Sequence, residues 1–133
     1  MVDELFDSPT FGLRMKEVII LRVAHLQASR YELIQHVGIA RAAGLTEQQI
    51  NAIIDTDDLD AAGFSRTERT ALDLITELCS THRLRDDSFT TADEVFGDEA
   101  LTELLMIVSC YYGLALVLNA VDLDVDATAR FQP

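Results

Sequence analysis

The sequence predicts an all-α protein, a bundle of about six helices. Strand signals are scarce, whereas four helix starts are marked by a hydroxyl residue with Glu or Gln three positions later. These capping boxes are Ser29/Glu32, Thr46/Gln49, Ser65/Glu68 and Thr91/Glu94. Between them, apolar residues recur at spacings of three and four, which is typical of helices that bury one face.

The expected helices cover residues 12–27, 30–43, 47–55, 66–83, 91–97 and 99–122. Gly44 should end the second helix, because glycine adopts the left-handed C-terminal conformation without steric cost. The polar stretches 55–60 and 83–88 are expected to be solvated loops. No repeat or linker divides the chain, so residues 1–133 should form one domain, in which 1–11 are a candidate arm that docks on a neighbouring subunit or frays.

Composition limits the classes of partner. Ten Lys and Arg stand against 23 Asp and Glu, which gives a formal net charge of −13, and Lys16 is the only lysine. Such a surface repels phosphate backbones and anionic lipid. The segment 45–55 has the cadence of a helix-turn-helix unit, but it contains no Arg or Lys with which to contact DNA. We therefore expect no nucleic-acid partner.

The segment 104–121 contains 18 residues without a formal charge. It is almost long enough to span a bilayer, but Glu103 and Asp122 flank it with no nearby Lys or Arg. We expect instead a helix buried in the core or in a subunit interface, because a helix that is apolar on all sides needs cover all round. The sequence thus favours a homo-oligomer that does not enter membranes.

The two cysteines, Cys79 and Cys110, lie 31 positions apart, without a CxxC motif or zinc-ligand spacing. They are expected to be small buried apolar residues of a reduced, cytoplasmic protein. The N-terminus lacks the basic start and apolar run of a signal peptide.

Glu17 and His36 are the candidate catalytic pair. Helical spacing places Glu17 on a largely apolar stripe with Leu13 and Leu21, and His36 on the inward face of the next helix. A buried carboxyl group beside an imidazole suits acid–base catalysis near neutral pH. The alternative is structural: Glu17 would pair with Arg14 or Arg22, and His36 would be a satisfied core histidine.

Glu32 has three interpretations. It could cap its helix with Ser29, act beside His36, or ligate a metal with His36. The metal interpretation is weak, because a zinc site needs three or four protein ligands and only the distant His25 or His82 could add a third. No metal is expected.

Three polar residues of the last helix are candidates for orienting a substrate carboxylate or carbonyl: Tyr111, Tyr112 and Asn119. Buried polar atoms need partners, so ordinary hydrogen bonds within the core are the alternative.

Residues 17–53, EVIILRVAHLQASRYELIQHVGIARAAGLTEQQINAI, resemble the carboxymuconolactone decarboxylase and AhpD-like family, and FSRTERTALDLITELC and YYGLALVLNAV extend the resemblance. In the alkylhydroperoxidase branch the motif is Glu, eleven residues, Cys, two residues, Cys, three residues, His. This chain keeps every spacing as Glu17, Ser29, Glu32 and His36. Both redox thiols are therefore replaced, and neither a serine nor a carboxylate can cycle through sulfenic acid and disulfide.

The resemblance implies an all-α fold, a homotrimer or homohexamer, and a pocket near a subunit boundary lined by Glu17, Tyr31, Glu32 and His36. Ser29 and Tyr31 join Tyr111, Tyr112 and Asn119 as the expected substrate-binding residues. Many relatives also have further helices before the matching glutamate, and this chain is shorter there.

Together these features favour an enzyme, a lyase or isomerase that acts without a cofactor on a small carboxylated or lactone-like metabolite. His36 would transfer the proton, Glu17 would adjust the basicity of His36, and Glu32 would assist. One alternative is a ligand-binding or assembly protein without catalysis. Another, disfavoured because CxxC is absent, is a peroxidase that uses Cys79 or Cys110.

Overall fold

The computed structural model describes residues 10–121, and every regular element in that range is helical. In order, the elements are α2 (Leu13–Leu26), α3 (Arg30–Ala42), α4 (Glu47–Asn51), the short π-helix η1 (Ala52–Thr56), α5 (Arg66–Thr81) and α6 (Asp86–Ala120). The prediction of an all-α fold is confirmed. Most of the expected arm, residues 1–9, lies outside the described residues.

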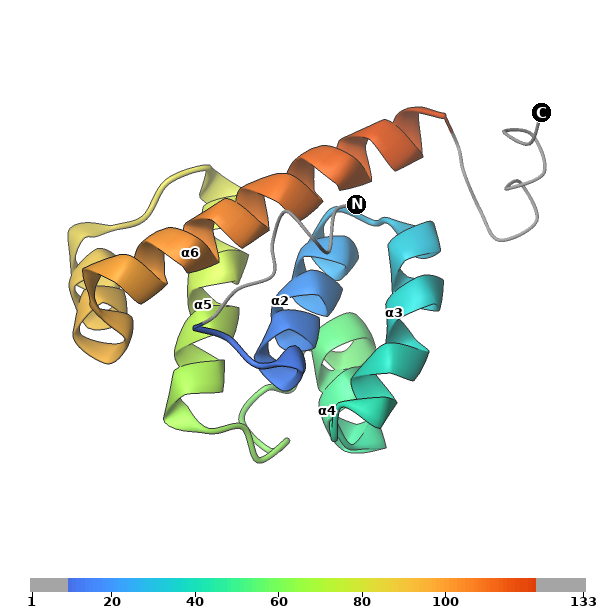
Figure 1. Cartoon of the computed structure of the whole chain (residues 1–133), viewed down its shortest axis with the longest axis horizontal. Helices are drawn as coiled ribbons and strands as arrows, with labels where there is room; N and C mark the ends of the chain where they lie inside the picture. The colour runs from blue at the N-terminus through green and yellow to red at the C-terminus, as the bar shows by residue number, and fades with distance from the viewer. Residues whose placement is uncertain (1–9, 122–133) are drawn as a thin grey trace.

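Helix α2 lies at the centre of the bundle, with α3 and α4 on one side, α5 on the other and α6 across them (Figure 1). It packs against α3, η1, α5 and α6. Eight consecutive residues, 17–24, are buried, which is what a helix enclosed on every side requires. Leu13, expected on the same stripe as Glu17, is instead 55% exposed, because it precedes the enclosed part of the helix.

Two apolar clusters meet at α2. Ile19 and Val23 pack with residues of α5 and α6 in the first cluster. Val18 and Leu21 face the other way and pack with residues of α3, η1 and α5 in the second. The orientation of α2 is therefore fixed from both sides, and so is the place of every polar side chain that it carries.

Two of the four predicted capping boxes are present. The side chains of Thr46 and Ser65 each accept a hydrogen bond from the backbone three residues on, and Gln49 and Glu68 bond back. The Ser29/Glu32 box is absent: Ser29 precedes α3, but its side chain makes no capping bond. The Thr91/Glu94 box is also wrong, because Thr91 lies inside α6, where its hydroxyl donates to the carbonyl of Asp87 at 3.0 Å.

The beginning of α6 differs from the expectation. The helix begins at Asp86, within the stretch 83–88 expected as a loop and five residues before the predicted start at 91. Asp86 and Asp87 occupy its first turn, where carboxylates interact favourably with the positive end of the helix dipole. The predicted break is nevertheless present, since Gly97 interrupts the helix with φ 79° and ψ 165°.

The turn after α3 follows the prediction for Gly44. Its φ of +100° is in the left-handed region that glycine adopts without steric cost. Its N–H donates to the carbonyl of Arg41 at 3.0 Å, and the N–H of Leu45 donates to that of Ala40 at 3.1 Å. These bonds end α3 and direct the chain back along the bundle.

The apolar stretch of α6 is only partly covered. Leu104, Ile107 and Val108 are buried in the first cluster, but Leu116 and Val117 are more than half exposed. Among the described residues, α6 is long and apolar enough to cross a membrane, and one third of its most apolar window is buried. The middle of the helix thus lies in the core, and its C-terminal part presents an apolar surface.

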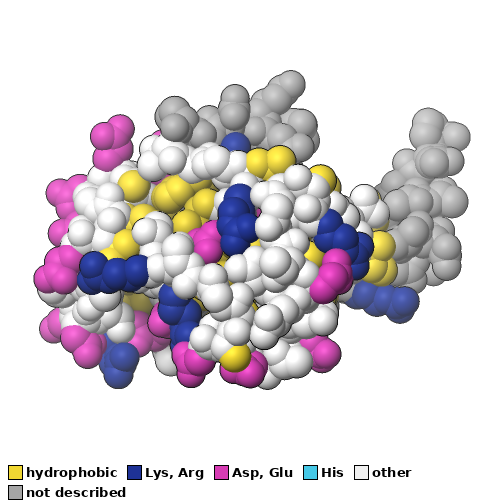
Figure 2. Space-filling model, turned by 90° about the horizontal axis from the view of Figure 1, so that it is seen from below, with side chains coloured by type: hydrophobic (Ala, Val, Ile, Leu, Met, Phe, Trp, Pro, Cys, Tyr) yellow, Lys and Arg dark blue, Asp and Glu magenta, His cyan; other side chains and the backbone are white. Residues whose placement is uncertain are grey.

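On the face seen in Figure 2, basic side chains are scattered among acidic ones instead of forming a patch. Ion pairs with exposed members include Arg41 with Glu47 and Arg69 with Asp73. Exposed pairs of this kind contribute little to stability, because water screens them.

Candidate active site

His36 lies between two buried carboxylates. Its Nδ1 is 2.9 Å from Oε2 of Glu17 on α2, and its Nε2 is 3.1 Å from Oε2 of Glu32, one turn earlier on α3. The side chains of Glu17, Glu32 and His36 are 4%, 7% and 14% exposed. We call these three residues the triad. The packing of α2 against α3 brings together all three residues that the sequence suggested for catalysis.

The triad favours a protonated imidazole. Burial alone lowers the pKa of His36, but the hydrogen bonds and negative charges of Glu17 and Glu32 outweigh burial and raise the pKa from 6.5 to about 9. At neutral pH both ring nitrogens therefore carry protons, each directed at a carboxylate oxygen. In this form His36 can donate a proton but cannot accept one, so any base at this site must be a carboxylate.

Helix α6 supplies the neighbours of the triad. The ring of Tyr111 meets the ring of His36 edge to face, with centroids 6.1 Å apart and an interplanar angle of 87°. Burial, together with the negative charge of Glu32, raises the pKa of the Cys110 thiol. Cys110 thus lies within electrostatic reach of the triad. Helical spacing did not predict this place for Cys110, and its position beside Tyr111 in the sequence was the only signal.

Ser29 is fully buried, and within residues 10–121 no hydrogen-bond partner is found for its Oγ. It directly precedes α3, one turn before Glu32. The expected capping box fails because the Glu32 carboxylate meets His36 instead of returning to the helix start. A buried hydroxyl without a partner is uncommon in folded proteins, so this position is suited to a bound water or a ligand oxygen.

The other expected substrate-binding residues lie in different surroundings. Tyr31 is half-buried on α3. The hydroxyl of Tyr112 is 3.5 Å from Nε2 of His82, and Asn119 donates to the carbonyl of Gln27 at 2.8 Å, where α2 ends. Of these residues, only Tyr111 is in ring contact with the triad. A role in binding substrate stays a prediction for all of them.

The alternative pairing of Glu17 with Arg14 or Arg22 is wrong. Arg14 bonds to Glu68 at 2.6 Å and to the carbonyl of Gly44 at 2.7 Å. Arg22 is almost fully buried and donates at 2.7 Å both to the carbonyl of Ile53 in η1 and to Asp57. Both arginines hold distant segments against α2, which leaves Glu17 to His36.

The histidines named as distant metal ligands are placed elsewhere. Nε2 of His25 is 3.4 Å from Asp57, and His82 lies beside Tyr112. In the range 10–121 no group of three or more His, Cys, Asp or Glu side chains is arranged to hold a metal ion.

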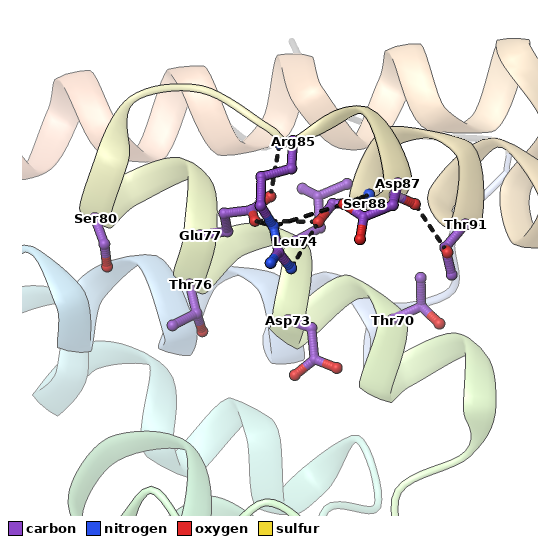
Figure 3. Close-up of a pocket in the computed structure, with 10 residues that line it drawn as sticks. All are labelled: Thr70, Asp73, Leu74, Thr76, Glu77, Ser80, Arg85, Asp87, Ser88 and Thr91. Atoms are coloured by element: carbon purple, nitrogen blue, oxygen red, sulfur yellow. Dashed lines mark hydrogen bonds and ion pairs between the residues drawn. The ribbon is translucent and has the colours of Figure 1, made fainter.

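A second polar region is a hollow of about 500 Å³ between α5 and the start of α6 (Figure 3). Hydroxyl groups and carboxylates line it, among them Thr70, Asp73, Glu77 and Thr91, and Arg85 is the one cation among the described residues that line it. None of the triad residues borders it. The hollow is therefore separate from the candidate active site.

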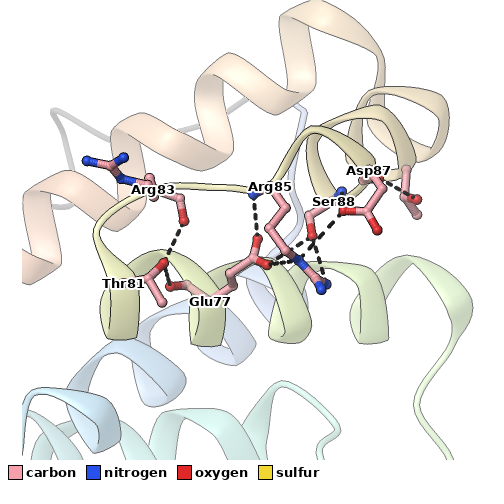
Figure 4. Close-up of polar contacts among 7 residues, drawn as sticks. Glu77, Thr81, Arg83, Arg85, Asp87 and Ser88 are labelled. Atoms are coloured by element: carbon pink, nitrogen blue, oxygen red, sulfur yellow. Dashed lines mark hydrogen bonds and ion pairs between the residues drawn. The ribbon is translucent and has the colours of Figure 1, made fainter.

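Glu77 accounts for much of the bonding around this hollow (Figure 4). Its carboxylate accepts hydrogen bonds from the backbone N–H of Arg85 at 3.3 Å, from Nε of Arg85 at 2.8 Å and from the Ser88 hydroxyl at 3.1 Å. These bonds fasten the α5–α6 connection to α5. The polar groups at this end of the hollow thus satisfy one another and serve the fold.

The fold and the site together describe an all-helical protein in which a histidine is buried between a glutamate of the central helix α2 and a glutamate one turn before the histidine on α3. The chain belongs to the carboxymuconolactone decarboxylase family, whose model matches residues 3–77. The matched part includes the whole triad.

A solved structure shares the fold. A protein of unknown function from Agrobacterium tumefaciens, described as a candidate antioxidant defence protein AhpD, superposes with a TM-score of 0.76 at 22% sequence identity. The alignment covers 90% of this chain and 82% of that one. No protein among those with curated functions matches the sequence significantly.

Proposed function

We propose that this protein is a cofactor-independent enzyme that transfers protons at the triad, in a lyase or isomerase reaction on a small lactone-like or carboxylated metabolite. The observation that carries the proposal is the buried His36 with a carboxylate on each ring nitrogen. Membership of the carboxymuconolactone decarboxylase family supports it. The setting would be cytoplasmic.

The geometry suggests a division of labour. Glu17 keeps its bond to Nδ1 and holds the ring in place. Glu32 turns from Nε2 toward the substrate and accepts a proton from a carbon next to a carbonyl. The Nε2–H of His36, released from Glu32, donates to the developing negative charge on the carbonyl oxygen. Return of the proton from Glu32 to a different carbon completes an isomerisation with no external reactant.

Peroxide reduction by a thiol receives less support. Ser29 and Glu32 occupy the positions of the redox cysteines and cannot perform their chemistry. Burial raises the pKa of both the Cys79 and the Cys110 thiol, which lowers the fraction of reactive thiolate. If untreated protein reduces peroxides with a thiol donor and alkylation abolishes that activity, the peroxidase alternative replaces this proposal.

Proton transfer is tested by isotope exchange. Purified protein is incubated in D₂O with small lactones and their carboxylated analogues, and NMR follows loss of the substrate C–H signal. Exchange above the buffer rate for at least one lactone is expected. Saturable binding without exchange for every compound would instead support the alternative of a ligand-binding or assembly protein.

We also propose that the C-terminal half of α6 is a contact between copies of this chain, as a homotrimer or homohexamer. Met106, Leu116 and Val117 are 56%, 52% and 59% exposed. Scattered apolar residues are ordinary on a surface, but a concentration on one helix marks an interaction site. A second copy fits better than a bilayer, because the flanking residues 103 and 122 are acidic.

The change Val117→Glu is expected to convert the oligomer to monomer, because each contact would have to bury a charge. Sedimentation velocity measures the change. The control Asn51→Glu, on the exposed surface of α4, should leave the oligomer intact. A monomeric wild type, or wild-type protein that partitions into lipid vesicles, would contradict the proposal.

A further inference from the structure

The triad carries an excess of negative charge. Two carboxylates and one imidazolium give a formal charge of −1, and all three side chains are largely shielded from water. In such surroundings charges interact more strongly than they do in bulk solvent. The balance of nearby cations therefore decides which substrates the site can accept.

The arginines of the two helices that form the triad are mostly engaged elsewhere. Arg14 bonds to Glu68, Arg22 bonds to Asp57 and the carbonyl of Ile53, and Arg41 bonds to Glu47. Lys16 and Arg30 are sequence neighbours of the triad acids. Each residue of an α-helix turns by about 100° around the axis. Lys16 therefore projects about 100° away from Glu17 on α2, and Arg30 projects about 200° away from Glu32 on α3.

The neighbours identified at the triad are uncharged. They comprise the aromatic ring of Tyr111 and the Cys110 thiol. Ser29, whose buried hydroxyl has no partner among the described residues, lies one turn before Glu32 at the start of α3. A substrate carboxylate would lose its hydration here, meet negative charge and find no arginine or lysine among these neighbours. A carbonyl or ester oxygen loses less on leaving water, and it can accept from a hydroxyl or from His36.

We propose that the site selects an uncharged substrate, a lactone or related carbonyl compound without a free carboxylate near the reacting atoms. The Ser29 hydroxyl is the proposed donor to a substrate oxygen. This inference rests on the proposed function and narrows it, since it favours lactone isomerisation over the decarboxylation that the family name suggests. The net charge of −13 for the whole chain acts in the same direction, because it repels anions on approach.

A matched pair of ligands tests the inference: a γ-lactone with one carboxymethyl group, and its methyl ester. The two probes share a ring and differ by one charge at pH 7.5. Ligand-observed NMR titration of wild-type protein should give at least about tenfold tighter binding of the ester. In Glu32→Gln the preference should fall to about threefold or less, whereas Glu47→Gln, an exposed acid paired with Arg41, should keep it.

Equal or tighter binding of the free acid would overturn the inference, and so would absence of ester binding at millimolar concentration. A preference that persists undiminished in Glu32→Gln would also overturn it, because the discrimination would then have another cause. The ligand comparison in wild-type protein needs no variant to fold. If the ester is preferred but exchanges no deuterium, the proton-transfer proposal fails while the charge selectivity stands.

Discussion

Replacement of His36 by alanine is expected to lower the rate of substrate deuterium exchange by about 10²- to 10⁴-fold, the usual contribution of a positioned acid or base. The variant leaves Glu17 and Glu32 facing each other without the imidazolium that separates them. Without the Nε2–H, nothing at the triad donates to the developing oxyanion. The measurement is the exchange rate under saturating lactone, compared with wild type at the same pH.

Glu17→Gln separates charge from shape in the same assay. Glutamine can still accept the Nδ1–H bond, but it lacks the negative charge that helps to keep His36 protonated. A smaller loss than in His36→Ala is expected, together with a pH profile displaced to lower pH. Glu47→Gln is the control and should match wild type. Equal rates for wild type and both triad variants would contradict the proposed roles of His36 and Glu17.

The second large effect is on stability as a function of pH. The folded protein holds the pKa of His36 at about 9, above its ordinary value of 6.5. The resulting stabilisation is fully present below pH 6.5, declines as pH rises toward 9, and is absent above 9. Each unit of difference between the pKa of His36 in the folded and in the unfolded protein is worth about 1.4 kcal/mol. The free energy of unfolding should therefore fall by about 3 kcal/mol from pH 6 to pH 10.

Urea unfolding at fixed protein concentration measures this change, since assembly would otherwise make stability depend on concentration. The variant His36→Gln provides the baseline, because it retains every other titrating group. The difference between the wild-type and variant free energies of unfolding should change by about 3 kcal/mol up to pH 9 and stay constant at higher pH. Parallel curves for the two proteins across the whole range would show that the triad does not hold a proton in the folded state.

The sequence predicted the helices better than their beginnings. At Thr46 and Ser65 the capping partners are local and have no competitor, so the pattern predicts the structure. At Ser29 the pattern fails because the Glu32 carboxylate bonds to His36, which comes four residues after it, and not to Ser29, which comes three residues before it. At Thr91 it fails because the acidic residues before it already begin the helix. A capping motif alone cannot report such competition.

The candidate site was partly predictable, because local spacing along the helices predicts the face on which a residue lies. Helical spacing indicates that Glu17 and His36 lie on the inward faces of their helices, and this was sufficient to predict that they meet. It does not indicate which distant group each polar side chain meets. Arg22 reaches η1 and Asn119 reaches the end of α2 across 31 and 92 positions of sequence. Such pairs depend on how helices pack.

The central position of α2 determines how the protein unfolds. One helix supplies side chains to both apolar clusters, so neither cluster can open without exposing a surface on which the other depends. The described bundle should therefore behave as a single cooperative unit in which the triad is lost together with the core, leaving no half-folded form that retains a working site.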